Sequence, residues 1–251
     1  MMKKILLSLV SIGLLFGCKT EKDNSNEKSE GLPKAETEAV KNSEEDWIYL
    51  LDGKNADGWR AYNGEAGLPE GWVVENESLK ALGKGGDIGG DIIYGKEKYG
   101  EFELYLEWKI APEGNSGIFY HVVEGEQYEA PYFNAPEYQV IDQLGFPRRL
   151  EELNSLGADY GMYAPDYKEE DIKKAGEWNT TRIIFTNDKV SYWLNGQKTV
   201  EFVPWSDDWE KRKSEGKWKE FPDYGKAREG FIGLQDHGSE VWYRNIKIKK
   251  L

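Results

Sequence analysis

The sequence predicts an all-β fold, an antiparallel sandwich or jelly roll, because short strand-like runs alternate with glycine and asparagine turns and no regular helical crossovers intervene. The clearest strand spans 101–110. Its apolar side chains occupy every second position from Phe102 to Ile110, with mostly charged residues between them. One face of this strand is therefore expected in the core, and the other in contact with water or ligand.

Further strands are expected at 117–123, 137–141, 182–186 and 189–194. Asn187-Asp188 joins the last pair and Asn195-Gly196 makes the next tight turn, a pattern that predicts a meander. Residues 72–82 predict another hairpin. Helical patterns are confined to 167–175 and about 207–219, and their high charge indicates minor peripheral helices.

The last strand, from Trp242 to Ile248, does not alternate cleanly. In perfect alternation Ile246 and Ile248 share a face with Arg244, and burying an unpaired guanidinium is costly. Either a bulge near Arg244-Asn245 exchanges the faces, or Arg244 points into a polar cleft.

The first 45 residues have the composition of an export signal and a linker. Lys3 and Lys4 precede an apolar run that is too short to span a membrane, so residues 1–17 are expected to be a signal peptide. The segment 15–18 (LFGC) resembles a bacterial lipobox and makes Cys18 the expected lipid attachment site; the alternative is a cleaved soluble peptide. Residues 18–45 are almost entirely polar and are expected to form a flexible lipidated tether before a folded domain at 46–251.

The charge of the chain limits its partners. The formal net charge is −13 and becomes −15 when Lys3 and Lys4 are removed with the signal peptide. Nucleic acid is therefore an unfavourable partner, and attachment to a membrane must depend on the N-terminal lipid. We expect a protein of the bacterial cell envelope, anchored to the outer membrane, on its periplasmic or its outer side; the sequence does not indicate an oligomeric state.

His237, one of two histidines, lies in a polar turn, 235–238, between runs that predict strands. An imidazole titrates near pH ~6.5 and serves as acid, base or ligand, and Asp236 could orient it. The alternative is a hairpin in which Asp236 and His237 satisfy backbone groups.

A second candidate follows Pro136. Glu137 and Gln139 project from one face of a strand, and a bulge after Gln139 would bring Asp142 to the same face. Two carboxylates about 5 to 10 Å apart are the usual apparatus of glycosidic cleavage, and Gln139 would then orient the substrate. Polar alternation alone favours a solvated surface strand, but the nearby aromatic residues of 128–133 favour a sugar-binding cleft.

The third candidate is 115–121, where Gly117 permits a close approach and His121 shares a face with Asn115. His121 is expected either to contact substrate or to be an ordinary surface histidine. No HExxH, EF-hand, CxxC or GxSxG pattern occurs, so the sequence defines no cofactor or metal site. A divalent ion held by scattered Asp, Glu and His side chains remains an alternative.

Over about residues 46–251 the chain resembles the 3-keto-disaccharide hydrolase family. The resemblance is carried by Leu51-Asp52-Gly53-Lys54, Gly58-Trp59, Gly100-Glu101-Phe102, Asn115-Ser116-Gly117-Ile118-Phe119, Glu137-Tyr138-Gln139, Gly176-Glu177-Trp178-Asn179, Leu194-Asn195-Gly196 and the closing segment 230–251. It implies a concanavalin A-like jelly roll and an enzyme that cleaves 3-keto-glycosides or 3-keto-disaccharides, by hydrolysis or by elimination and hydration.

The resemblance also implies roles for single residues. Either His237 or Glu137 would act as the base and the other as the acid, with Asp236 orienting His237. Substrate would be held by Gln139, Asp142, His121 and Arg244. The alternatives are a non-catalytic lectin-like domain, which would use the same sandwich and aromatic residues, and a scaffold domain of a surface complex.

Overall fold

The computed structural model describes residues 46–85 and 90–251. The expected signal peptide (1–17), the lipid site Cys18 and the tether (18–45) lie outside the described residues. Within the described ranges, no helix combines the length and the apolar character needed to cross a membrane.

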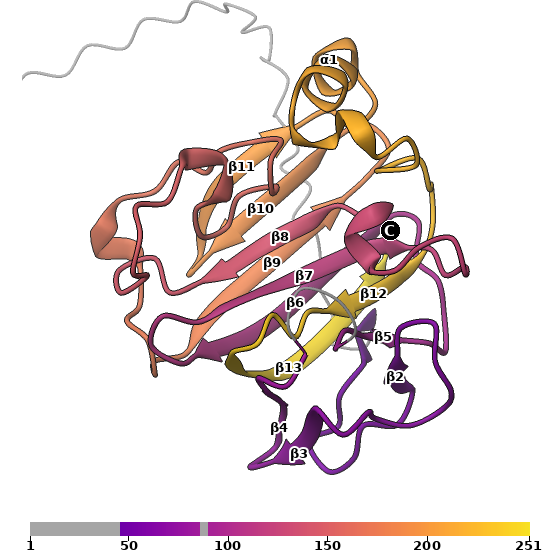
Figure 1. Ribbon diagram of the computed structural model, residues 1–251, viewed down its shortest axis with the longest axis vertical. Coiled ribbons are helices and arrows are strands. Elements are labelled where there is room, and N and C mark those ends of the chain that lie inside the picture. The colour runs from indigo at the N-terminus through magenta and orange to yellow at the C-terminus, as the bar shows by residue number, and fades with distance from the viewer. Residues whose placement is uncertain (1–45, 86–89) are drawn as a thin grey trace, which may run out of the picture. The chain divides into compact units, whose positions relative to one another are not determined.

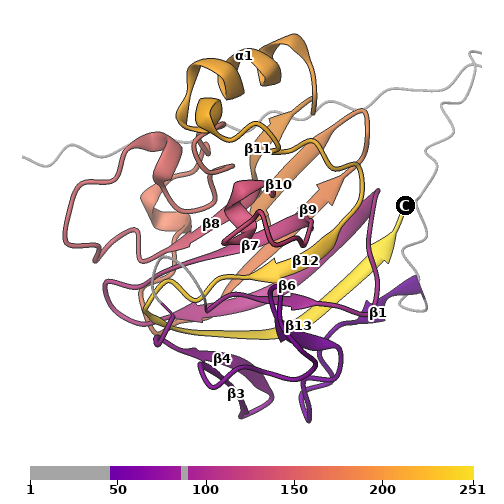
Figure 2. The ribbon, with the colours of Figure 1, turned by 45° about the vertical axis from the view of Figure 1, so that its right-hand side comes forward.

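Two antiparallel sheets pack as the layers of a sandwich (Figure 1, Figure 2). The larger has the order β11-β10-β9-β6-β13-β4-β3, with β1 also paired to β13, and the smaller has the order β2-β5-β12-β7-β8. The strands of the larger sheet are β1 (Ile48–Tyr49), β3 (Trp72–Glu75), β4 (Ser78–Leu82), β6 (Phe102–Ile110), β9 (Asn179–Phe185), β10 (Val190–Leu194), β11 (Gln197–Phe202) and β13 (Glu240–Lys250). Those of the smaller sheet are β2 (Trp59–Ala61), β5 (Ile92–Tyr94), β7 (Asn115–Val122), β8 (Glu137–Ile141) and β12 (Phe231–Leu234). The predicted fold, a concanavalin A-like jelly roll, is confirmed.

The core lies between the sheets, as the alternation in β6 predicts. Phe102, Leu104 and Leu106 are fully buried there, while Glu107 on the opposite face reaches the surface. The predicted meander is also confirmed, because β9, β10 and β11 are consecutive antiparallel neighbours.

A bulge in β13 resolves the irregular alternation of the last strand. The register with β6 shifts between Arg244 and Lys247, and Asn245 adopts a left-handed backbone with φ of 50°. Tyr243 and Ile246 can therefore both enter the core. Arg244 points away from the core, where it pairs with Glu107 at 2.7 Å.

The alternative of a hairpin around 235–238 is wrong, because β12 and β13 belong to different sheets. β12 is bonded on its two edges by β5 and β7, and β13 by β6 and β4, so neither has a free edge for the other. The turn that carries His237 instead crosses from one layer to the other.

The helix expected near 207–219 is present as α1 (Asp207–Glu215) followed by a 3₁₀ turn, Lys217–Glu220. Ser206 caps α1 by accepting the Trp209 amide at 3.3 Å. The segment is anchored to the sandwich because Trp218 stacks on Tyr224 with ring centroids 4.1 Å apart and donates from Nε1 to the Tyr160 carbonyl at 2.8 Å.

The helix expected at 167–175 is wrong; only a 3₁₀ turn forms, at Glu169–Asp171. The Asp171 carboxylate accepts the Lys168 amide, and its carbonyl accepts the side-chain amide of Asn195, so local and tertiary bonds replace a helical ladder. Two further 3₁₀ turns occur at Pro131–Phe133 and Glu152–Asn154.

Candidate active site

A cleft of about 300 Å³ lies on the face of the smaller sheet that points away from the sandwich core. Because β12, β7 and β8 are neighbours, they bring together residues more than a hundred positions apart in the chain (Figure 1). The lining residues are Asn115, Tyr132, Glu137, Gln139, Tyr160, Lys217, Trp218, Gln235 and His237.

Glu137 lies almost flat on the sheet. It is 4 % exposed, and a Cβ on Gly117 of the neighbouring strand would fall 2.8 Å from Glu137 Cδ. The close approach that Gly117 permits is therefore that of the Glu137 side chain. Within the described residues, no hydrogen bond occupies the Glu137 carboxyl group, which leaves it available to a ligand.

Burial raises the pKa of Glu137 to about 8, because the charged form loses its hydration. The ammonium of Lys217 opposes this shift, and the buried carboxyls of Asp91 and Asp159 reinforce it. At neutral pH the Glu137 carboxyl is thus mostly protonated and can donate a proton.

Lys217 is a cleft residue that the sequence did not reveal, since it lies in a segment that looks like an ordinary charged surface helix. The 3₁₀ turn after α1 places its Nζ 3.7 Å from the Tyr160 ring centroid and 4.8 Å from that of Trp218. Partial desolvation lowers the pKa of Lys217, and the charge of Glu137 opposes the shift. The cleft therefore holds the ammonium group of Lys217 together with the titratable carboxyl group of Glu137.

Three amide side chains supply neutral hydrogen-bonding groups to the cleft. Gln139 is 3 % exposed, and its Nε2 donates to the Asn154 carbonyl at 3.3 Å. Asn115 Oδ1 and Gln235 Oε1 are buried and accept no hydrogen bond from the described residues. Unpaired buried acceptors of this kind suit the hydroxyl groups of a sugar.

His237 lines the cleft, and Asp236 fixes the turn that carries it. The Asp236 carboxylate accepts the amides of Gly85 at 2.8 Å and Gly238 at 3.0 Å, and its own amide donates to Asp91 at 3.0 Å. Asp236 is fully buried and does not line the cleft. It positions His237 by holding the backbone before and after this residue.

The structure places His121 and Arg244 away from the cleft. His121 is 1 % exposed, with Nε2 2.8 Å from the Gly100 carbonyl, and burial lowers its pKa to about 4. Arg244 lies on the outer face of the other sheet, 3.9 Å from the Trp178 ring centroid. These two predicted substrate contacts are thus separated from Glu137.

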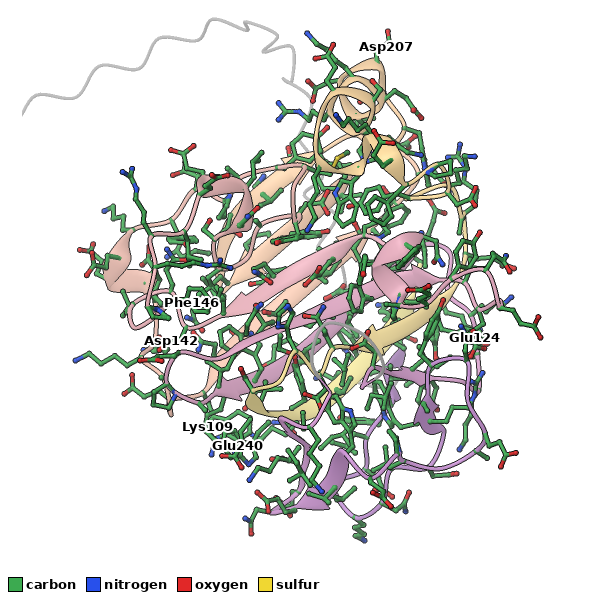
Figure 3. The ribbon with its side chains drawn as sticks, viewed as in Figure 1. Lys109, Glu124, Asp142, Phe146, Asp207 and Glu240 are labelled. Carbon is green, nitrogen blue, oxygen red and sulfur yellow. The ribbon has the colours of Figure 1, made fainter. Side chains whose placement is uncertain are left out.

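Asp142 is also outside the cleft lining. The β7–β8 register runs without a bulge from Phe119 opposite Glu137 to Asn115 opposite Ile141, so the expected bulge after Gln139 is absent. The Asp142 carboxylate accepts the amides of Glu113 at 2.9 Å and Gly145 at 3.0 Å, and thereby holds the loop after β8 (Figure 3). Of the seven predicted site residues, the cleft itself gathers Glu137, Gln139 and His237.

Within 46–85 and 90–251, no group of three or more His, Cys, Asp and Glu side chains is arranged to hold a metal ion.

Comparison with known proteins identifies the family of the chain. Residues 46–249 match the model of the 3-keto-α-glucoside-1,2-lyase-like domain. The whole chain aligns, at 32 % identity, with the full length of a 3-keto-disaccharide hydrolase of Bacteroides thetaiotaomicron.

Two solved structures from Parabacteroides distasonis, both described as candidate glycosyl hydrolases, share the fold. The first is 37 % identical, with a TM-score of 0.76 over 83 % of this chain and 97 % of that one. The second is 27 % identical, with a TM-score of 0.62 over 82 % of this chain and 99 % of that one.

Proposed function

Because the chain belongs to the 3-keto-α-glucoside-1,2-lyase-like family and is a glycoside-cleaving enzyme, we propose that its substrates are 3-keto-glycosides, including 3-keto-disaccharides. The observation that carries the proposal is a buried carboxyl group, Glu137, in one cleft with the imidazole of His237. Such a pair supplies the acid and the base that cleavage next to a ketone needs.

A ketone at carbon 3 makes the proton on carbon 2 acidic. Removal of this proton gives an enolate, whose electron pair forms the double bond between carbons 1 and 2 as the bond from carbon 1 to the leaving oxygen breaks. The leaving oxygen takes up a proton and departs as an alcohol. Addition of water across the double bond then returns a free 3-keto sugar.

The raised pKa of Glu137 supports its assignment as the acid that protonates the leaving oxygen. His237 is the base that takes the proton from carbon 2. Lys217 stabilises the negative charge that develops on the ketone oxygen, as a preorganised cation does best in a partly desolvated site.

The remaining lining residues hold the sugar. Asn115, Gln139 and Gln235 bond its hydroxyl groups, and the rings of Tyr132, Tyr160 and Trp218 pack against its apolar faces.

The test is turnover of 3-keto-trehalose and simple 3-keto-glucosides in deuterated water. Elimination followed by hydration incorporates deuterium at carbon 2, whereas direct hydrolysis leaves the original hydrogen there. Glu137→Gln and His237→Asn should each reduce kcat by about 10²- to 10⁴-fold, the usual contribution of a positioned acid or base.

His121→Asn is the matched control, because His121 is the other histidine and lies outside the cleft. Saturable binding without turnover by the wild type would instead favour a lectin, and absence of any sugar binding would favour a scaffold domain.

We also propose that Cys18 carries a lipid and that the enzyme resides in the bacterial cell envelope, on the basis of the lipobox-like segment 15–18. Cys18→Ser should release the protein from the membrane fraction of the expressing bacterium. Retention of the serine variant in that fraction would contradict this assignment.

A further inference from the structure

A second pocket, also of about 300 Å³, adjoins the candidate active site. Asn115, Gln139 and Tyr160 line both spaces, so the two pockets share a boundary. Gln139 links them directly, because its Nε2 donates to the carbonyl of Asn154, a residue of the second pocket. A substrate unit attached to a sugar beside Glu137 can therefore extend past Gln139 into this pocket.

Two arginines that are consecutive in the chain distinguish the second pocket from the first. Arg148 and Arg149 line it, and the Arg148 guanidinium lies 5.6 Å from the ring centroid of Phe146 (Figure 3 labels Phe146, beyond the end of β8). No carboxylate oxygen of the described residues lies within 4.0 Å of either guanidinium, although Glu151 lines the same pocket.

Of the other five arginines, four pair with carboxylates of the described residues. Arg60, Arg182, Arg212 and Arg244 each form an ion pair with a carboxylate, and Arg228 stacks on Trp205 at 3.4 Å from the ring centroid. The chain has 46 acidic residues against 33 basic ones, yet neither Arg148 nor Arg149 pairs with a carboxylate of the described residues. Planar guanidinium groups bind carboxylates and sulfates through two parallel hydrogen bonds.

We propose that this pocket is the subsite for the substrate unit next to the 3-keto sugar and that it selects an anionic unit, a carboxylate or a sulfate ester. The proposal rests on the proposed function, since it places the scissile bond between the two pockets. It makes acidic 3-keto-glycosides the preferred substrates of this enzyme.

The test compares three 3-keto-glucosides whose phenolic leaving groups have nearly equal acidity. Their para substituents are carboxymethyl, sulfooxymethyl and the neutral carbamoylmethyl group. The wild type should show kcat/KM about 10-fold higher for at least one anionic glycoside than for the neutral one, a ratio that corresponds to about 1.4 kcal/mol. The carboxymethyl and sulfooxymethyl compounds show which anion the pocket prefers.

The double variant Arg148→Gln/Arg149→Gln should lower this ratio to about 1, and added salt should lower it in the wild type. Arg228→Gln, which removes an arginine outside both pockets, should leave the ratio unchanged. A wild-type ratio near 1, or a ratio that survives in the double variant, overturns the subsite.

Direct binding separates this proposal from the proposed function. If no glycoside is cleaved, the dissociation constants of the same compounds are measured with the wild type and the double variant. An approximately 10-fold tighter binding of an anionic glycoside that is lost in the double variant supports the subsite even then. Equal binding of all three compounds refutes it.

Discussion

Replacing Glu137 by Gln should stabilise the folded protein while it removes activity. The carboxyl group is buried against Gly117, and its pKa of about 8 lies far above the ordinary value of 4.5. In the unfolded chain at pH 7 the same group is ionised. Folding at neutral pH must therefore either protonate Glu137 or bury its charge, and both are unfavourable. Gln keeps the shape of the side chain without this penalty.

The magnitude follows from the two pKa values. Below pH 4.5 the carboxyl group of Glu137 is protonated in both the folded and the unfolded state, so its ionisation does not lower the free energy of unfolding. As the pH rises above 4.5, stability is lost at about 1.36 kcal/mol per pH unit until the folded group also ionises near pH 8. The advantage of Glu137→Gln should thus grow from near zero at pH 4 to roughly 3 kcal/mol at pH 7 and roughly 5 kcal/mol at pH 9.

Urea unfolding of the two proteins at pH 5, 7 and 9 measures this difference. Comparison between pH values cancels any constant effect of the buried amide. The matched control is Glu124→Gln, because hydrogen bonds from Arg60 lower the pKa of Glu124 (labelled in Figure 3). That variant should be destabilised at pH 7, and its deficit should shrink on acidification. A difference for Glu137→Gln that does not change with pH would refute the reasoning.

Three further substitutions test other parts of the structure. Gly117→Ala would place a methyl group 2.8 Å from Glu137 Cδ and should reduce kcat by at least about 10-fold, whereas Gly100→Ala, with no neighbour nearer than 3.4 Å, should not. Burial lowers the pKa of His121 to about 4, so its contribution to stability is complete above pH ~6.5 and is lost as the pH falls to 4. In His121→Asn the free energy of unfolding should therefore decrease less between pH ~6.5 and pH 4, by on the order of 3 kcal/mol. An unchanged dependence of this free energy on pH would contradict the buried neutral imidazole. Arg244→Ala should lower the free energy of unfolding by about 1 kcal/mol, because the contacts of Arg244 with Glu107 and Trp178 are lost, and it should leave kcat/KM unchanged. A loss of activity would show that the outer face takes part in the reaction.

The strands were predictable because alternation depends only on which face is buried. The expected range 137–141 equals β8, and 101–110 differs from β6 by one residue. The pairing of the strands was harder to predict from the sequence. β12 and β13 are separated by a short turn, yet they form hydrogen bonds with different neighbouring strands. Local sequence identifies a strand, whereas its partners are fixed by competition among all the edges of the sandwich.

The site was predictable only in part, for a related reason. Glu137 and Gln139 could be inferred as a pair because they alternate with the buried Tyr138. Asp142 was misplaced because its carboxylate is used by backbone amides of a loop, which residue type alone cannot show. Lys217 was missed because its position depends on Trp218 anchoring the segment after α1 to the sandwich.

A raised pKa does not by itself identify the catalytic acid of this fold. Asp159 has a pKa of about 8 and Asp91 a pKa of about 7, both because of burial. Asp159 is fully enclosed and accepts the Tyr192 hydroxyl at 3.3 Å, and Asp91 accepts the amide of Asp236.

Neither aspartate lines the cleft, whereas Glu137 does. Both raise the pKa of Glu137 when they are ionised. Access to the cleft, rather than a raised pKa, therefore distinguishes Glu137 as the proposed proton donor.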